Sequence, residues 1–294
     1  MALTKEAPLG SYRVRAGLLL RKALLINGTL FNSEAWHGMT QQQVEDFEQI
    51  DEALLRGLQN GHSKIPIPAL YLESSQTPIR YILACRRVLY LHTILHRSQT
   101  DLIRRVYTAQ KADPVKGDFC QLVEGDLKLI GLDITEGEIE QMSRGQLKSK
   151  LKQQSKKAAF QYLLEMKDQK SKMDDIEYKT FQLQPYLTTP LFSADDASLL
   201  LALRTRTVRG VRSDFGNMYG SKVCPLPDCG EQDSLSHLQV CDVLRDLVPV
   251  DEGEPEYKDV FSMEISKQKE VVILYHRLLE AREQIQDAAS EDED

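Results

Sequence analysis

Three cysteines and one histidine lie close together in the last third of the chain. They are Cys224, Cys229, His237 and Cys241, separated by gaps of four, seven and three residues. Thiolate and imidazole groups are the usual ligands of structural zinc, and two ligands from a tight turn can meet two from one helical turn around a tetrahedral ion. The spacing therefore predicts a small zinc module. Its first gap is wider than the two residues typical of such modules, so Pro225 and Pro227 must loop outward.

A row of arginines precedes this cluster. Guanidinium groups bind phosphate bidentately with little supporting structure, so the row predicts contacts to a phosphate backbone. Its members are Arg204, Arg206, Arg209 and Arg212. The aromatic residues Phe215 and Tyr219 follow. They would either stack on nucleobases or hold the zinc module against the preceding helix.

A second basic segment runs from Ser143 to Met173, with nine Lys or Arg residues and two acidic ones in a chain whose net charge is -7. Charge distribution matters more than the sum for nucleic-acid binding. We expect salt-dependent phosphate contacts from Lys148, Lys152, Lys156 and Lys157. The alternative is that these lysines form a solvated helix face.

No combination of residues typical of catalysis stands out. The acidic pair Asp174 and Asp175 could hold metal ions for phosphoryl transfer, but it is not expected on a strand or hairpin. The pair Asp195 and Asp196 suits the first turn of a helix. His92 lies four residues before His96 but lacks the adjacent Glu of a metalloprotease motif. We therefore expect binding rather than catalysis.

Hydrophobic periodicity predicts an all-α fold, because apolar residues recur every three or four positions and no stretch alternates with period two. Capping boxes are expected at Thr40, Thr135 and Ser143. One long helix is predicted from Pro78 to about Val106, and a last helix near 266–285.

Five segments are expected from these patterns. They are a helical domain at 1–112, a basic helical linker domain at 113–192, the arginine-rich helix with the zinc module at 193–250, a C-terminal helix at 251–287 and an acidic disordered tail at 288–294. Neither a signal peptide pattern nor an apolar run long enough to span a bilayer is found, and we expect an intracellular protein that does not enter membranes.

Several motifs, in their order along the chain, resemble the C-terminal half of non-LTR retrotransposon reverse transcriptases, beyond the palm. The resemblance covers about residues 12–283 and rests on Leu30–Trp36, Gln49–Arg56, Tyr71–Glu73, Pro78–Arg80, Arg86–Leu95, Gln110, Gly117–Phe119, Leu203–Arg206 and the Cys-Cys-His-Cys cluster. Two features depart from the family pattern: Phe119 stands where Trp is common, and the first Cys gap is wider.

The resemblance implies a thumb-like bundle, a linker and a zinc knuckle that grip the template-primer duplex or target DNA in the nucleus. It also implies that Arg86, Arg87 and the arginine row contact RNA-DNA or DNA. Since the palm aspartates of the family have no counterpart in this sequence, we expect no polymerase activity from this chain alone, and the palm and fingers are expected as a partner. The chain would then be a fragment, a truncated copy or a module with a new use.

A different reading is an interaction protein whose helices scaffold a protein partner. In that case the zinc site is purely structural and the lysines are solvated. The net charge and the acidic C-terminal residues favour this reading. Both interpretations share the all-α fold and the zinc module.

Overall fold

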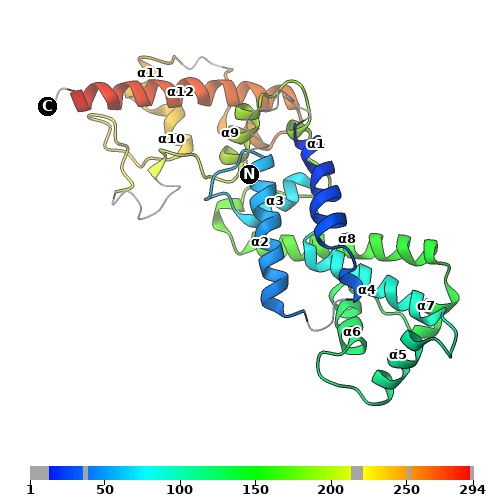
Figure 1. Cartoon of the computed structure of the whole chain (residues 1–294). Helices are drawn as coiled ribbons and strands as arrows, with labels where there is room; N and C mark the ends of the chain where they lie inside the picture. The colour runs from blue at the N-terminus through cyan, green and yellow to red at the C-terminus, as the bar shows by residue number, and fades with distance from the viewer. Residues whose placement is uncertain (1–12, 36–38, 213–220, 250–252, 292–294) are drawn as a thin grey trace.

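The computed structural model describes residues 13–35, 39–212, 221–249 and 253–291. Within these ranges the chain forms helices α1 to α12 and short turns of other helical types. The described residues contain no sheet, only one antiparallel bridge between Val223 and Gln232. The predicted all-α class is confirmed, and Figure 1 shows an elongated arrangement with α12 at one end and α5 to α7 at the other.

The first helical segment packs on α2 (Gln41–Leu58). It begins as α1 (Arg13–Leu20) and continues as a π-helical stretch, η2 (Arg21–Thr29). Gly17 allows this close approach, because a Cβ atom at this position would lie 2.0 Å from Leu58 Cδ2 and the Leu58 side chain would have to shift. The predicted capping box at Thr40 starts α2.

The long helix predicted from Pro78 to Val106 is wrong. The structure instead contains α4 (Ile79–Leu95) and α5 (Leu102–Ala112), preceded by α3 (Ile67–Ser74). The break has a local cause, since the side chain of Asp101 accepts a hydrogen bond from the Ile103 N–H at 2.9 Å and so begins a new helix.

Three helices follow, α6 (Phe119–Leu129), α7 (Glu136–Gln141) and α8 (Arg144–Asp168). The predicted capping boxes at Thr135 and Ser143 are both present. Helix α8 has 25 residues and buries one stripe with four-residue spacing, which leaves its lysines outside the core. The stripe consists of Leu147, Leu151, Ser155, Ala159 and Leu163.

Four helices of the described ranges form the C-terminal part of the chain, where the predicted metal cluster lies. They are α9 (Ala194–Arg204), α10 (Leu235–Val240), α11 (Asp242–Arg245) and α12 (Ile265–Glu291). Helix α12 extends beyond residue 287, so the start predicted for the acidic tail is wrong. The remaining elements are short 3-10 turns at Ser33–Ala35, Ser171–Met173, Pro185–Leu187 and Tyr257–Phe261.

The core divides into three hydrophobic clusters, and two of them join distant parts of the chain. The largest combines Val14 of α1 with residues as far along the chain as Ala281 of α12. A second joins α4 to α8 and crosses the boundary that we expected at residue 112. No helix in the described ranges is long and apolar enough to cross a membrane.

Candidate metal centre and basic groove

The four predicted metal ligands meet in space. Their ligand atoms all lie within 4.8 Å of one another. Cys229 Sγ is 3.2 Å from His237 Nε2 and 3.7 Å from Cys241 Sγ. Ligand atoms held about 2.0–2.3 Å from a tetrahedral zinc ion are themselves roughly 3.3–3.8 Å apart. The cluster therefore has dimensions that suit a metal ion.

The wide first gap forms a tight turn. The Cys224 N–H donates to Glu231 O at 2.7 Å, which closes the loop on itself. Asp228 and Gly230 both have positive φ, 59° and 67°, and this left-handed backbone brings Cys229 back toward Cys224. The four-residue gap is thus compatible with convergence of the two thiols.

The other two candidate ligands are His237 of α10 and Cys241, the residue that follows this helix. Ser234 Oγ accepts a hydrogen bond from the His237 N–H at 3.1 Å and caps the helix, while Cys241 lies at its end. Burial raises the pKa of the Cys224 thiol to about 12 and also raises the pKa of Cys241. A bound cation would offset this cost, because metals bind the thiolate form.

A buried ion pair holds the metal cluster against α12. The Asp233 carboxylate accepts hydrogen bonds from Arg282 Nη1 at 2.8 Å and from Arg282 Nη2 at 2.7 Å. It also accepts one from the Arg212 N–H at 2.6 Å. The Tyr275 hydroxyl adds a bond to Leu235 O at 2.8 Å. The module is therefore part of the C-terminal core.

The arginine row does not form one phosphate-binding surface. Arg204 is 6% exposed, with Nε 3.1 Å from Glu73 Oε1 and Nη1 2.8 Å from Val260 O. The prediction that Arg204 contacts nucleic acid is therefore wrong, because its guanidinium is buried in the core. The sequence did not reveal that the acidic partner of Arg204 would be Glu73 of α3, 131 residues earlier in the chain.

The remaining arginines of the row differ in their surroundings. Arg206 forms an ion pair with Asp175 near the surface, Arg209 is exposed, and Arg212 is partly buried. Phe215 and Tyr219 lie outside the described residues. Only Arg209 keeps the open exposure expected of a phosphate contact.

The arginines of α4 are also engaged with the protein. Arg87 Nε lies 2.5 Å from Asp126 Oδ2 in a buried pair, so its predicted nucleic-acid contact is wrong. Arg86 donates hydrogen bonds to the carbonyl oxygens of Ile26 and Leu30. Through these hydrogen bonds Arg86 fixes the turn after η2.

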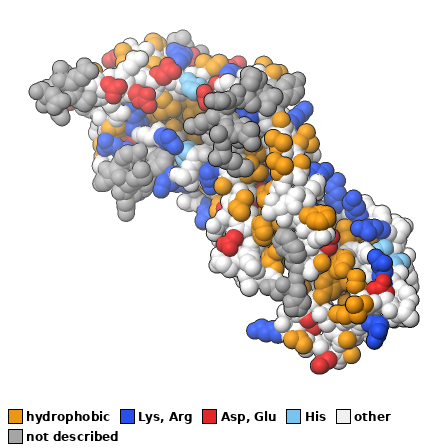
Figure 2. Space-filling view, viewed as in Figure 1, with side chains coloured by type: hydrophobic (Ala, Val, Ile, Leu, Met, Phe, Trp, Pro, Cys, Tyr) orange, Lys and Arg blue, Asp and Glu red, His pale blue; other side chains and the backbone are white. Residues whose placement is uncertain are grey.

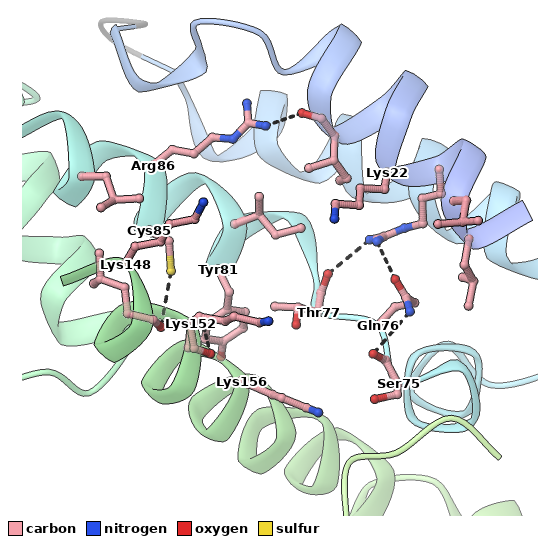
Figure 3. A pocket seen from close by; sticks show the side chains of 18 of the residues that line it. Lys22, Ser75, Gln76, Thr77, Tyr81, Cys85, Arg86, Lys148, Lys152 and Lys156 are labelled. Carbon is pink, nitrogen blue, oxygen red and sulfur yellow. Dashed lines mark hydrogen bonds between the residues drawn. The ribbon is translucent and has the colours of Figure 1, made fainter. Parts of the chain in front are cut away.

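The predicted lysines of α8 line a groove of about 790 Å³ between α8, α4 and the first helical segment. Lys148, Lys152 and Lys156 stand on the α8 wall, and Arg15 and Lys22 stand on the opposite one. Figure 3 shows Lys22 across from the lysines of α8. In the space-filling view, Lys and Arg side chains follow the flank of the molecule where α1 and α8 lie (Figure 2).

These five cations, all exposed, have no acidic neighbour in the groove, because its described lining contains no carboxylate. Arg21, which also lines it, is neutralised by Asp51 in a buried ion pair. Lys157 is exposed but does not line the groove. Sequence reasoning missed Arg15 and Lys22, although their seven-residue separation puts them on one helix face.

The groove floor is apolar. Its apolar residues come from three helices, α1, α4 and α8, and include Leu18, Ile82, Leu89 and Leu151. Cys85 lies at its base, where the thiol donates to Leu151 O at 3.7 Å. The groove thus combines a hydrophobic floor with a cationic rim.

One member of each acidic or histidine pair considered for chemistry has a structural partner. Asp175 pairs with Arg206, and Asp196 Oδ2 lies 2.6 Å from Lys269 Nζ. His92 Nε2 contacts Met142 O at 2.9 Å. Each of these groups is accounted for by packing.

Comparisons with known proteins found no matching family model, no matching curated protein and no matching solved structure.

Proposed function

We propose that this chain binds nucleic acid, with the phosphate backbone along the rim of the basic groove. The observation that carries the proposal is the convergence of five exposed cations from segments more than a hundred residues apart, without a lining carboxylate. Such a field attracts polyanions and releases their counterions on binding. The α8 lysines predicted from sequence supply three of the five.

The nucleic acid that we propose is an RNA-DNA or DNA duplex, held by the C-terminal region of a non-LTR retrotransposon reverse transcriptase acting in the nucleus. Support for this identity comes from the motif order alone, from Leu30–Trp36 to the Cys-Cys-His-Cys cluster. The palm and fingers of the same polymerase would be its partner. In this proposal the groove positions the duplex and performs no chemistry.

We further propose that the Cys-Cys-His-Cys cluster binds Zn²⁺ as a structural ion. Three thiols and one imidazole exclude hard cations such as Mg²⁺, which prefer oxygen ligands. All four ligands come from the protein, as in structural rather than catalytic zinc sites. The ion would fix the turn at Cys224 and Cys229 against α10.

Equilibrium binding of a fluorescent duplex at several salt concentrations tests the proposed function. We expect affinity to fall steeply with salt, with a slope of the logarithmic plot near -0.9 per phosphate contacted. Five contacts would give a slope of about -4 to -5. Affinity that does not change between low and physiological salt would contradict the proposal.

A second candidate is a scaffold for a protein partner. The apolar groove floor favours it, because an amphipathic helix with an acidic border would match both floor and rim. The two candidates separate in a pull-down with and without nuclease. Partners lost after nuclease treatment support the first candidate, and partners retained after nuclease treatment support the second.

A further inference from the structure

A smaller cavity continues the basic groove toward the turn after η2. It has a volume of about 310 Å³ and shares Arg86 and Leu89 with the groove. This volume is at the lower end of the range for small-ligand pockets, roughly 300–1,000 Å³. The cavity can therefore take one planar ring and its sugar rather than a helix.

The chemistry of the cavity differs from that of the groove. Phe31 is 68% exposed, and Tyr90 provides a second aromatic ring. Asn27 and Asn32 bring side-chain amides, and Glu34 adds a carboxylate. Stacking surfaces beside amide donors and acceptors recognise the faces and edges of nucleobases.

The cation row reaches this cavity along α8. Arg144 lines it, and Lys148 lines the groove one turn later. Arg144, Lys148, Lys152 and Lys156 follow each other at four-residue spacing, about 6 Å per step along the helix axis. A nucleic-acid strand whose phosphates follow this row would have one of its bases next to the cavity.

Arg86 holds the rim of the cavity in place. Its guanidinium donates to Ile26 O and Leu30 O and, at 3.3 Å, to Ser33 Oγ. Phe31 and Asn32 lie between these anchor points, and Asn32 has a positive φ of 54°. Arg86 thus fixes the backbone of the turn, while the Phe31 ring stays exposed to solvent.

We infer that the cavity binds one unpaired nucleobase of a single-stranded segment, stacked on Phe31. This inference rests on the proposed function, because the groove must first hold the strand. A base inside a duplex could enter only after leaving its stack, which costs a few kcal/mol. The cavity therefore favours a single strand or a strand end over a blunt duplex.

The test uses the full chain, a short single strand that carries a fluorescent adenine analogue, and a blunt duplex. Phe31→Ala should weaken single-strand binding about five- to 100-fold, abolish quenching of the analogue and leave duplex binding unchanged. Phe31→Trp should restore both signals. Leu24→Ala is the matched control, since Leu24 is 63% exposed and lines neither cavity.

Phe31→Ala with unchanged single-strand affinity and unchanged quenching would overturn the inference. If the same protein still binds the duplex in a salt-dependent way, the proposed function stands. Absence of salt-dependent binding by the unaltered chain would overturn both. Circular dichroism of each variant confirms that the exposed substitution leaves the helices intact.

Discussion

Asp233 and Arg282 form a bidentate, fully buried ion pair that joins the metal cluster to α12. The side chains are 0% and 3% exposed, and the two bonds measure 2.8 and 2.7 Å. Because Asp233 follows Cys229 by four residues and precedes His237 by four, it ties the ligand loop to the helix. The pair determines where the cluster lies.

Replacing Arg282 should destabilise the fold strongly. Arg282→Leu leaves the Asp233 carboxylate buried without its counter-charge, and we expect a loss of about 3–5 kcal/mol in the free energy of unfolding. Urea denaturation measures this. Arg277→Leu, on the exposed side of the same helix, should change stability by no more than about 1 kcal/mol. Equal effects of the two variants would contradict this role.

Arg204 should matter for stability and not for binding. Arg204→Met leaves the Glu73 carboxylate buried without its counter-charge, so we expect a loss of about 3–5 kcal/mol in urea denaturation. Nucleic-acid affinity of the folded fraction should stay at the level of the unaltered chain. Arg206→Met is the control, because it also removes one positive charge but at a residue near the surface. A steep loss of affinity with unaltered stability would show that Arg204 reaches the ligand after all.

The purified protein should contain one zinc ion per chain. Cys229→Ser and Cys241→Ser should each lose it, because three ligands bind the ion more weakly than four, and a chelator should lower the melting temperature. Elemental analysis measures the content. Cys85→Ser and Cys120→Ser, which change thiols outside the cluster, should retain zinc. Full zinc content in the Cys229→Ser and Cys241→Ser variants would refute the ligand assignment.

Asp196 should contribute stability that disappears only in strong acid. Hydrogen bonds from Lys269 and Ser193 outweigh the opposing effect of burial and lower its pKa to about 2. His276 also faces this carboxylate, at 3.4 Å. Since the folded pKa lies below the ordinary value near 3.8, the contribution is complete above that value and is lost as pH falls through about 2.

Asp196→Asn should therefore cost about 1–2 kcal/mol near neutral pH, and the difference from the unaltered chain should vanish below pH 2. Denaturation across the acid range measures this. Asp195→Asn is the neighbouring control, because it removes the same charge without a lysine partner. A difference that persists unchanged through strong acid would contradict the linkage to Asp196.

Local sequence signals predicted the secondary-structure elements better than they predicted the contacts between those elements. Capping residues at Thr40, Thr135 and Ser143 act over three positions, so the sequence alone located these helix starts. The break at Asp101 was missed, because apolar periodicity continued through it and hid the cap. Periodicity is thus a weaker guide to helix ends than capping chemistry.

The metal cluster and the basic groove were predicted to different degrees, because local patterns are visible in the sequence and contacts between distant segments are not. The Cys-Cys-His-Cys cluster was predicted correctly because its spacing is short and chemically specific, and the four side chains do converge. The burial of Arg87 and Arg204 could not be read from the sequence, since their partners Asp126 and Glu73 come from other helices. The groove itself arises only when the fold places the first helical segment and α8 on its opposite sides.

The most direct test compares two double variants of α8 with equal charge change. Lys148→Gln with Lys152→Gln removes groove cations, whereas Lys150→Gln with Lys157→Gln removes exposed lysines that do not line it. The salt dependence of duplex binding should become shallower by about 1.8 for the groove variant and remain unchanged for the control. Equal slopes for both variants would contradict the account that the basic groove holds the phosphate backbone.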